Sequence, residues 1–318
     1  MTMFLLYMAK PSYGGWVSFT AHLALKYNYQ IIKLASRTEN RTRDFGYSAK
    51  YRNVSLDFLM EIPSSKIIIT AVDKHYREYI DLLYGSALVI HDPTEFKLKI
   101  PYEFFNVITI RSKVHQTLLN NGVLNVFKKH PFYCFPKNIR QKSHAVSISR
   151  IDYDKNIDII LEANGLINGE TEKVLLYGKQ NELYSYHKLR SLDFDKYYKG
   201  KFEKSFMALD EILAPAKFVV DMSSIKGDGG GTQYTFLEAI YFDCILILNK
   251  KWTEVEGSIF NSNNCYIVDD AKTLVLALEN GNNIHNSYKN KSIVDNAKLL
   301  LQSFILENDW QEGNIGYH

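Results

Sequence analysis

Short apolar runs alternate with amphipathic stretches along most of this sequence. Such an alternation favours an α/β fold, because each helix supplies the crossover that joins two parallel strands. In the N-terminal half the runs predict strands at Phe4–Met8, Gln30–Leu34, Lys66–Thr70, Ala87–Ile90 and Asn106–Ile110. Helical spacing between them predicts helices at Val17–Lys26, Tyr76–Leu83 and Lys113–Asn120.

The alternation stops at Lys128–Ser143, a stretch with two prolines, several basic residues and no clear periodicity, which we interpret as an interdomain linker. The pattern then resumes, with strands at Ala145–Ser149, Lys173–Tyr177, Phe218–Asp221 and Cys244–Leu248 and helices at Ile157–Asn164, Phe206–Leu213, Tyr234–Tyr241, Lys272–Glu279 and Val294–Ile305. We therefore expect two Rossmann-like domains that face each other across a cleft, residues 1–141 and 142–305. A tail, residues 306–318 with Trp310, is expected to return to the first domain.

Composition limits the class of protein. The length of 318 residues fits two domains, and 38 Lys and Arg against 35 Asp and Glu exclude a histone-like or tail-type nucleic-acid binder. Cys134, Cys244 and Cys265 form no metal-ligand or disulfide pattern, which suits a reducing cytoplasm. No apolar run approaches the roughly 20 residues of a membrane helix. We expect a soluble cytoplasmic protein without membrane insertion, and we interpret Met1–Met8 as a strand, not a signal peptide.

Two glycine-rich segments each precede a predicted helix. One, Pro11–Trp16, contains a pair of glycines, and the other, Lys226–Ala239, contains three in succession. Glycine lets backbone amides approach a ligand, and a helix N-terminus attracts anions, so both segments suit phosphate binding. The first is equally well explained as a tight strand–helix turn, and the second is otherwise a surface loop. The first lacks the three-glycine dinucleotide fingerprint, so NAD binding is not supported.

Two cations follow the first strand of the second half, in the segment Ser149–Asn156. Arg150 and Lys155 lie between the carboxyl end of that strand and the next helix. An arginine fork and a lysine point charge at this place can clamp a diphosphate. In the alternative, the segment is a solvated loop in which Arg150 pairs with Asp152 or Asp154. The position at a strand end favours the clamp.

A histidine and an aspartate, His91 and Asp92, follow a predicted strand of the first half. At the carboxyl end of a strand both side chains are expected to point into the cleft. A lone histidine is otherwise a structural residue whose hydrogen bonds are satisfied within the fold. The topological position adds weight to a functional role.

Together these segments resemble the retaining, nucleotide-sugar-dependent glycosyltransferases of GT-B fold, the family 4-like group. The most specific match is SRIDYDKNIDIILEA, which begins at Ser149 and resembles the diphosphate-binding strand–helix motif of the family. The other matches, in chain order, are to the N-terminal glycine loop, the cleft histidine, the last helix before the linker and the helix with the ribose-binding glutamate. They lie at Tyr13–Gly15, Ile90–Asp92, Ile110–Val123 and Thr232–Leu248.

The resemblance implies a hexosyl- or pentosyltransferase that moves a sugar from a nucleotide diphosphate sugar, UDP-sugar first of all, to an acceptor hydroxyl with retention of configuration. It implies no metal and no cofactor besides this co-substrate, because the basic pair supplies the positive charge. Catalytic roles fall to His91, Asp92, Arg150 and Lys155. Donor contacts fall to Gly14, Gly15, Arg150, Lys155, Gly178, Asp228, Gly229, Gly230, Gly231, Thr232 and Glu238.

The sequence departs from the family at two places. Gly230 stands where the family usually has the first of two glutamates, and Asp228 nearby is a candidate substitute. Phe242-Asp243-Cys244 replaces the usual small residue and glycine before the next strand. Both departures resemble those of viral glycosyltransferases that modify DNA bases.

Basic and aromatic residues are interleaved in Ser36–Arg52, which we interpret as a long loop beside the cleft. Such a mixture suits phosphate contacts and base stacking, and the basic linker adds a second positive stretch. We predict acceptor contacts from Tyr13, Trp16, Arg37, Arg41, Arg43, Tyr47, Lys50 and Arg52. These residues favour a hydroxymethylated base in duplex viral DNA as the acceptor.

Other functions stay open at this point. A glycan, a lipid-linked sugar or a small molecule is the alternative acceptor. A non-transferring nucleotide-sugar enzyme, such as an epimerase or a hydrolase, is the alternative activity. A nucleic-acid-binding module with a degenerate sugar site is the third class, because Gly230 departs from the family pattern.

Overall fold

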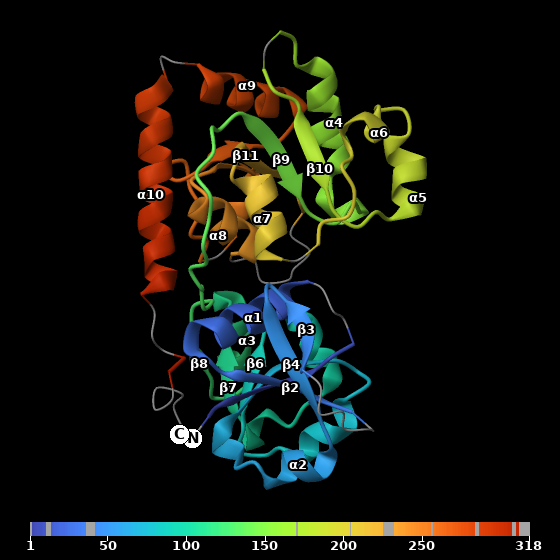
Figure 1. Ribbon diagram of the computed structural model, residues 1–318, viewed down its shortest axis with the longest axis vertical. Helices are drawn as coiled ribbons and strands as arrows, with labels where there is room; N and C mark the ends of the chain where they lie inside the picture. The colour runs from blue at the N-terminus through green and yellow to red at the C-terminus, as the bar shows by residue number, and fades with distance from the viewer. Residues whose placement is uncertain are drawn as a thin grey trace. The chain divides into compact units, whose positions relative to one another are not determined.

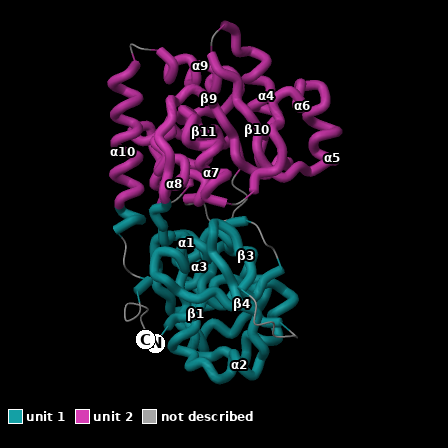
Figure 2. The backbone as a smooth tube through the Cα atoms, viewed as in Figure 1, with its two compact units in different colours: residues 1–135, 227–229, 303–318 teal, residues 136–226, 230–302 magenta. Residues whose placement is uncertain are grey.

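The computed structural model describes residues 2–10, 14–35, 42–169, 171–203, 205–224, 232–255, 257–283, 286–306 and 310–311. The chain divides into two compact units (Figure 2). Among the described residues, unit 1 contains those up to Phe135 and those from Ser303 onward, and unit 2 contains those from Pro136 to Gln302. Each unit has its own sheet with helices beside it (Figure 1).

Unit 1 is built on an eight-stranded sheet in the order β3-β4-β2-β1-β5-β6-β7-β8. Its strands are β1 (Phe4–Met8), β2 (Gln30–Leu34), β3 (Thr42–Gly46), β4 (Ala49–Val54), β5 (Ile67–Val72), β6 (Ala87–Ile90), β7 (Asn106–Thr109) and β8 (Val126–Phe127). Neighbouring strands are parallel except β3 and β4, which pair antiparallel. The helices are α1 (Gly15–Tyr27), α2 (Leu56–Glu61) and α3 (Ser112–Asn120), with 3₁₀ helices at Ser64–Lys66, Arg77–Leu82, Pro93–Leu98 and Tyr102–Phe104.

Unit 2 is built on a five-stranded parallel sheet in the order β10-β9-β11-β12-β13. Its strands are β9 (His144–Ile148), β10 (Val174–Tyr177), β11 (Ala216–Asp221), β12 (Ile245–Asn249) and β13 (Tyr266–Val268). The helices are α4 (Ile157–Leu166), α5 (Glu182–Tyr184), α6 (Phe194–Tyr197), α7 (Phe206–Leu213), α8 (Tyr234–Tyr241), α9 (Ala271–Asn282) and α10 (Ser287–Ile305). A π-helical turn at Ser185–Leu189 and 3₁₀ helices at Tyr153–Lys155 and Lys250–Trp252 complete it.

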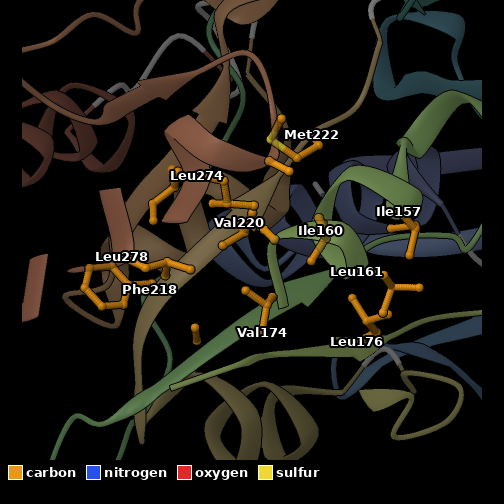
Figure 3. Close-up of a cluster of buried hydrophobic side chains, with 14 of the residues drawn as sticks. Ile157, Ile160, Leu161, Val174, Leu176, Phe218, Val220, Met222, Leu274 and Leu278 are labelled. Atoms are coloured by element: carbon orange, nitrogen blue, oxygen red, sulfur yellow. The ribbon is translucent and has the colours of Figure 1, made fainter. Parts of the chain in front are cut away.

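The core of unit 2 contains side chains from the sheet and from α4 and α9. Figure 3 shows this cluster, which includes Ile157, Ile160, Leu161, Val174, Leu176, Phe218, Val220, Met222, Leu274 and Leu278. Gly281 near the end of α9 lies so close to Phe218 that a Cβ there would stand 2.4 Å from the ring. Burial of this apolar surface holds α4 and α9 on the sheet.

Alternate residues of the central strands of unit 1 face opposite sides of the sheet. Leu6 and Met8 of β1 belong to one core cluster together with Ile32 and Leu34 of β2. β1 and β6 are buried almost throughout, so their sequences read as continuous apolar runs, whereas β2 contains the half-buried Gln30 and Lys33. The predicted strands Phe4–Met8, Gln30–Leu34 and Ala87–Ile90 are confirmed residue for residue.

The loop predicted at Ser36–Arg52 is wrong over its described part, because β3 and β4 form a hairpin there. Its two-residue turn consists of Tyr47 and Ser48, with φ values of 52° and 63°. A turn of this kind needs positive φ at both positions and usually carries Asn or Gly, so Tyr-Ser is not recognisable as a hairpin turn in the sequence. The helix predicted at Tyr76–Leu83 is a 3₁₀ helix.

Residues 128–143, all of which the structure describes, contain no helix or strand, as predicted. They are nevertheless not an exposed linker, since Lys128, His130, Phe132 and Phe135 are buried. Trp310 is 0% exposed, and its indole N–H donates to a carbonyl of this segment, that of Lys129, at 2.8 Å. In the part of the chain that the structure describes, no helix combines the length and the apolar character that a membrane crossing requires.

Candidate functional site

The strand order of unit 2 indicates where a ligand binds. From β9 the chain moves to β10 on one side and later to β11 on the other, so a topological switch point lies between β9 and β11. Open α/β sheets bind ligands beyond the carboxyl ends of their strands at such a point. The segment directly after β9 carries the predicted clamp, Arg150 and Lys155.

Hydrogen bonds join the two loops at this switch point. The Asn156 side chain donates to the Met222 carbonyl at 2.8 Å and lies 2.9 Å from the Ser224 hydroxyl oxygen. The Ser224 N–H donates to the Asp154 carbonyl at 2.8 Å. The loop after β11 therefore fixes the backbone that carries the predicted clamp.

Arg150 forms ion pairs within its own loop. Its guanidinium lies 2.7 Å from the Asp152 carboxylate and 3.0 Å from that of Asp154, which is the alternative considered for this residue. The Arg150 side chain is 54% exposed. Exposed ion pairs are worth about 0–1 kcal/mol, so a diphosphate can displace these carboxylates at small cost. Lys155 ends the 3₁₀ helix Tyr153–Lys155 and is half-buried.

Helix α8 begins after Gln233, which stands at its N-cap. Among the described residues, the side chain of Gln233 at its N-cap forms no capping hydrogen bond. By contrast, α7 and α9 are capped by the side chains of Ser205 and Asp270. The Phe236 N–H donates to the Gln233 carbonyl at 3.0 Å. The helix dipole favours an anion at this N-terminus.

Two predicted donor contacts lie at α8. Thr232 is buried, and its hydroxyl donates to the Gln233 carbonyl at 3.3 Å. Glu238 is 1% exposed inside the helix. Burial, and after it the charge of Glu238, raises the pKa of the Tyr234 phenol well above its usual range. Four further predicted contacts, Asp228, Gly229, Gly230 and Gly231, lie outside the described residues.

Close packing explains why the predicted donor contact Gly178 is a glycine. Its φ is 154°, and a Cβ there would stand 1.7 Å from the Ser149 carbonyl oxygen. Its N–H donates to the Gly200 carbonyl at 2.9 Å, and its own carbonyl accepts the Tyr198 hydroxyl at 2.9 Å. The end of β10 thus lies against the loop that carries Arg150, so packing alone requires glycine at this position.

The described residues contain no group of three or more His, Cys, Asp or Glu side chains that suits a metal ion. The predicted absence of a metal stays a prediction, because Asp228 is not among the residues described.

In unit 1 the switch point lies between β1 and β5. Asp73, the first residue after β5, accepts the N–H of Lys10 at 2.6 Å and that of His75 at 2.8 Å. Gly14, with φ 103°, precedes α1, and Gly15 begins it. No described atom lies within 4 Å of the position that a Cβ would take on either glycine. Among the described residues, a Cβ on either glycine would therefore meet no other segment of the chain.

Sequence reasoning missed two charged residues near this point, Asp73 and Lys33. The Lys33 ammonium lies 5.2 Å from the ring centroids of both Tyr7 and Tyr51. Burial lowers the pKa of Lys33, and the charge of Asp73 opposes that shift. Asp73 was recognisable as the first charge after an apolar run, where ligands gather in such sheets. Lys33 was not recognisable, because a single lysine in a predicted strand is normally interpreted as a residue on the solvent-exposed face.

His91 is buried and neutral. Its side chain is 5% exposed, and its Nε2 lies 2.8 Å from the Thr70 carbonyl oxygen. A carbonyl only accepts hydrogen bonds, so Nε2 carries the proton and Nδ1 is the acceptor. Burial lowers the pKa of His91 to about 4, so the imidazole is uncharged at neutral pH. His91 can accept a hydrogen bond from a hydroxyl, while its ring N–H is used by Thr70.

Asp92 caps a helix. Its carboxylate accepts the Thr94 N–H at 2.8 Å, at the start of the 3₁₀ helix Pro93–Leu98. Glu95 of the same helix accepts the Asp92 N–H at 3.2 Å, which completes a capping box. Asp92 therefore caps this helix, and its predicted catalytic role beside His91 stays a prediction.

The cations of the β3–β4 hairpin differ in their surroundings. Arg43 and Lys50 are exposed. Arg52 is half-buried, with its guanidinium 4.6 Å from the ring centroid of Phe58. The predicted acceptor contacts Tyr13, Arg37 and Arg41 lie outside the described residues.

The two aromatic acceptor contacts that the structure describes are engaged elsewhere. Tyr47 is 1% exposed, and its hydroxyl oxygen lies 3.1 Å from Ser18 Oγ, so its ring is not available for stacking on an acceptor. The half-buried Trp16 donates a hydrogen bond from its side chain to Glu95. Glu95 is a third residue of unit 1, after Asp73 and Lys33, that the sequence did not single out.

Two lysines of the predicted basic linker bind helix ends. Lys142 donates to the carbonyls of Leu213 and Phe242, and Lys137 donates to that of Tyr241. These carbonyls end α7 and α8, where cations are favoured by the helix dipole. The expectation that the whole stretch offers its charge to phosphates is therefore wrong for these two lysines.

No protein-family profile and no curated protein matches the sequence. Solved structures do match. HepE of Anabaena in complex with UDP has a TM-score of 0.67 at 11% identity, over 99% of this chain and 97% of that one. A glycosyltransferase from Rickettsia africae has a TM-score of 0.64 at 13% identity, over 96% and 95%. An alpha-glucosyltransferase (AGT) in complex with UDP has a TM-score of 0.65 at 11% identity, over 93% and 95%.

At these identities the similarity establishes the fold, and it extends over both units. The protein therefore has the GT-B fold of these glycosyltransferases.

Proposed function

We propose that the protein is a retaining glycosyltransferase that uses a nucleotide diphosphate sugar, with UDP-sugar as the first candidate. The observation that carries this proposal is the switch point of unit 2, where the loop with Arg150 and Lys155 is tied to the loop after β11. A nucleoside diphosphate is held by cations and by N–H donors at a helix start. The fold supports the same function, since HepE and AGT were solved with UDP.

In the proposed reaction the acceptor hydroxyl attacks the anomeric carbon from the face that the diphosphate leaves. The bond to the leaving oxygen breaks, the glycosidic bond forms on the same face, and the proton of the acceptor moves to the diphosphate. Negative charge grows on that diphosphate, so Arg150 and Lys155 stabilise the transition state more than the ground state. His91 accepts a hydrogen bond from a hydroxyl of the donor sugar through Nδ1.

The proposed acceptor is a hydroxymethylated base in duplex DNA, with a glycan, a lipid-linked sugar or a small molecule as the alternative. Support comes from Arg43 and Lys50, which are exposed on the hairpin and suit backbone phosphates. The departures at Gly230 and at residues 242–244 support the same acceptor class, through the resemblance to DNA-modifying enzymes.

The proposed location is the cytoplasm. All three cysteines are thiols that are not part of a disulfide, with Cys134 exposed and Cys244 and Cys265 buried. Free thiols are typical of a reducing compartment.

A donor panel tests the activity. The protein is incubated with UDP-, GDP- and ADP-sugars, with and without acceptors, and release of nucleoside diphosphate is measured by mass spectrometry. Release that depends on an acceptor supports transfer. Release or sugar conversion without an acceptor supports the hydrolase or epimerase instead. No release with any donor sinks the enzyme proposal and leaves the binding module.

The acceptor is tested with duplex DNA that contains hydroxymethylated cytosine, and with the unmodified duplex as the matched control. We expect sugar incorporation only into the former, and gel-shift binding of both duplexes that weakens with salt. The double variant Arg43→Ala, Lys50→Ala should weaken binding, whereas Lys201→Ala, at an exposed position of unit 2, should not. Absence of binding at low salt removes DNA from the candidates.

A further inference from the structure

Glu95 is a buried carboxyl group that has no role in the reaction proposed above. It lies in the 3₁₀ helix Pro93–Leu98 and is 4% exposed. Its Oε1 accepts the N–H of His91 at 3.0 Å and the N–H of Asp92 at 3.2 Å. Its carboxyl also accepts a hydrogen bond from the side chain of Trp16. One carboxyl group therefore connects the start of α1 with the loop after β6.

These contacts exceed what a helix cap requires. In a capping box the glutamate side chain accepts only the N–H of the N-cap residue, here Asp92. The bonds to His91 and Trp16 are additional, and they join two segments that the sequence singled out. Trp16 directly follows Gly14 and Gly15, and its ring centroid lies 6.3 Å from that of His91.

Charged and titratable groups surround this carboxyl on several elements. They are Asp92 at the N-cap of its helix, His91 after β6 and Tyr102 on a neighbouring 3₁₀ helix. Burial raises the pKa of Tyr102 and the charge of Arg77 opposes that shift, whereas burial and the charge of Arg111 both lower the pKa of His91. Burial, followed by the charge of Asp92, raises the pKa of Glu95 to about 8, although its N–H donors oppose the shift. Glu95 therefore changes its charge close to neutral pH.

We propose that Glu95 is a positioning residue that ties the Trp16 indole to the His91 backbone and so places the His91 ring. The effect of Glu95 on turnover rests on the proposed function. The tie, meaning the hydrogen bonds that Glu95 accepts from the Trp16 indole and the His91 N–H, does not depend on that function. Hydrogen bonds to a charged acceptor are roughly twice as strong as those to a neutral one. Loss of the Glu95 proton therefore strengthens the hold on Trp16 and His91, and protonation weakens it.

The tie is tested by fluorine NMR on the full chain, with 5-fluorotryptophan at its three tryptophans. The resonance of Trp16 is identified with Trp16→Phe. We expect it to shift around pH 8 in the wild type and to stay fixed in Glu95→Gln. The Trp310 indole donates to a carbonyl, which does not titrate, so its resonance is an internal reference. A Trp16 resonance that stays fixed in the wild type, or that shifts equally in Glu95→Gln, overturns the proposal.

Kinetics test the positioning. Glu95→Gln keeps the shape and an acceptor oxygen, so we expect it to retain most of the wild-type kcat but to lose the change in rate around pH 8. Glu95→Ala loses the contacts and should lower kcat/KM on the order of 100-fold, because small misplacements cost that much. Glu103→Gln changes an exposed carboxyl of the neighbouring 3₁₀ helix and should leave the pH profile unchanged.

The outcomes separate this proposal from the proposed function. If the wild type turns over no donor, the proposed function fails, and the fluorine titration decides the tie by itself. If the wild type is active and the pH profile of Glu95→Gln equals that of the wild type, Glu95 positions nothing and the proposal is overturned. Circular dichroism checks that Glu95→Ala folds. If it does not, the Glu95→Gln profile carries the decision.

Discussion

Lys137 forms an ion pair with Asp243, with 3.5 Å between its ammonium nitrogen and Oδ2. The other carboxylate oxygen of Asp243 lies 3.0 Å from the ammonium of Lys298. The backbone of Asp243 has φ 62°, a left-handed conformation that glycine adopts without strain. The family that this sequence resembles usually has a glycine in this segment. In this chain Asp243 adopts the backbone conformation that favours glycine, and its carboxylate pairs with both Lys137 and Lys298.

Asp243→Gly and Asp243→Ala should therefore differ in stability. Glycine loses both exposed ion pairs, worth about 0–1 kcal/mol each, but removes the backbone strain. Alanine loses the same pairs and keeps a conformation that costs about 1–2 kcal/mol. We expect urea unfolding to show Asp243→Ala less stable than Asp243→Gly by about 1 kcal/mol or more. Equal losses in the two variants would show that the left-handed backbone is not strained.

Gly178→Ala should destabilise unit 2, because its Cβ would stand 1.7 Å from the Ser149 carbonyl oxygen. Overpacking against backbone costs about 1–3 kcal/mol or more, and the loss is measured by thermal unfolding. Gly165→Ala is the matched control, since no described atom lies within 4 Å of its Cβ position in α4. That variant should gain up to about 1 kcal/mol from helix propensity. A Gly178→Ala variant as stable as the wild type would refute the packing explanation.

The buried His91 should make folding sensitive to acid. Its pKa is lowered to about 4 in the folded chain from an ordinary 6.5, so the unfolded chain takes up the proton first as the pH falls. The stabilisation is complete above pH 6.5 and is lost as the pH falls toward 4. Urea unfolding at several pH values should show a steeper loss for the wild type than for His91→Gln. His187→Gln, at an exposed position, should follow the wild type. Parallel curves for wild type and His91→Gln would contradict the assignment.

Arg150→Ala should lower kcat/KM about 100- to 1000-fold with the best donor sugar, because a preorganised cation at the developing charge is lost. Arg150→Lys should recover only part of this, since lysine lacks the planar fork. Lys188→Ala, an exposed lysine of the same unit, is the control for nonspecific charge effects. Steady-state kinetics measure the effect, and circular dichroism checks the fold. Wild-type rates in both Arg150 variants would remove the clamp from the mechanism.

The sequence predicted the elements of the fold where burial is uniform. β1 and β6 are almost completely buried, so their apolar runs begin and end where the strands do. The β3–β4 hairpin was missed because β3 is largely exposed and its Tyr47-Ser48 turn carries no glycine or asparagine. Strand β13, with three residues, is too short to show a periodicity.

The candidate site was predicted in part. The strand ends that carry Arg150 and His91 were located, because strand ends can be read from the apolar runs. Their hydrogen-bond partners could not be chosen in the same way. The choice between a free Arg150 and one paired with Asp152 or Asp154 depends on loop geometry, and the structure selects both pairs.

The sequence by itself determined an α/β chain in two halves, with cations and glycines placed after particular strands, because local periodicity and glycine spacing act over short stretches. Only the tertiary structure decided which of these residues meet. It places Asp73 beside the N–H of Lys10, 63 residues away, and Lys137 on the carbonyl of Tyr241, 104 residues away. Such contacts follow from how the sheet and its helices pack, since packing brings polar groups from distant segments within hydrogen-bonding distance of one another.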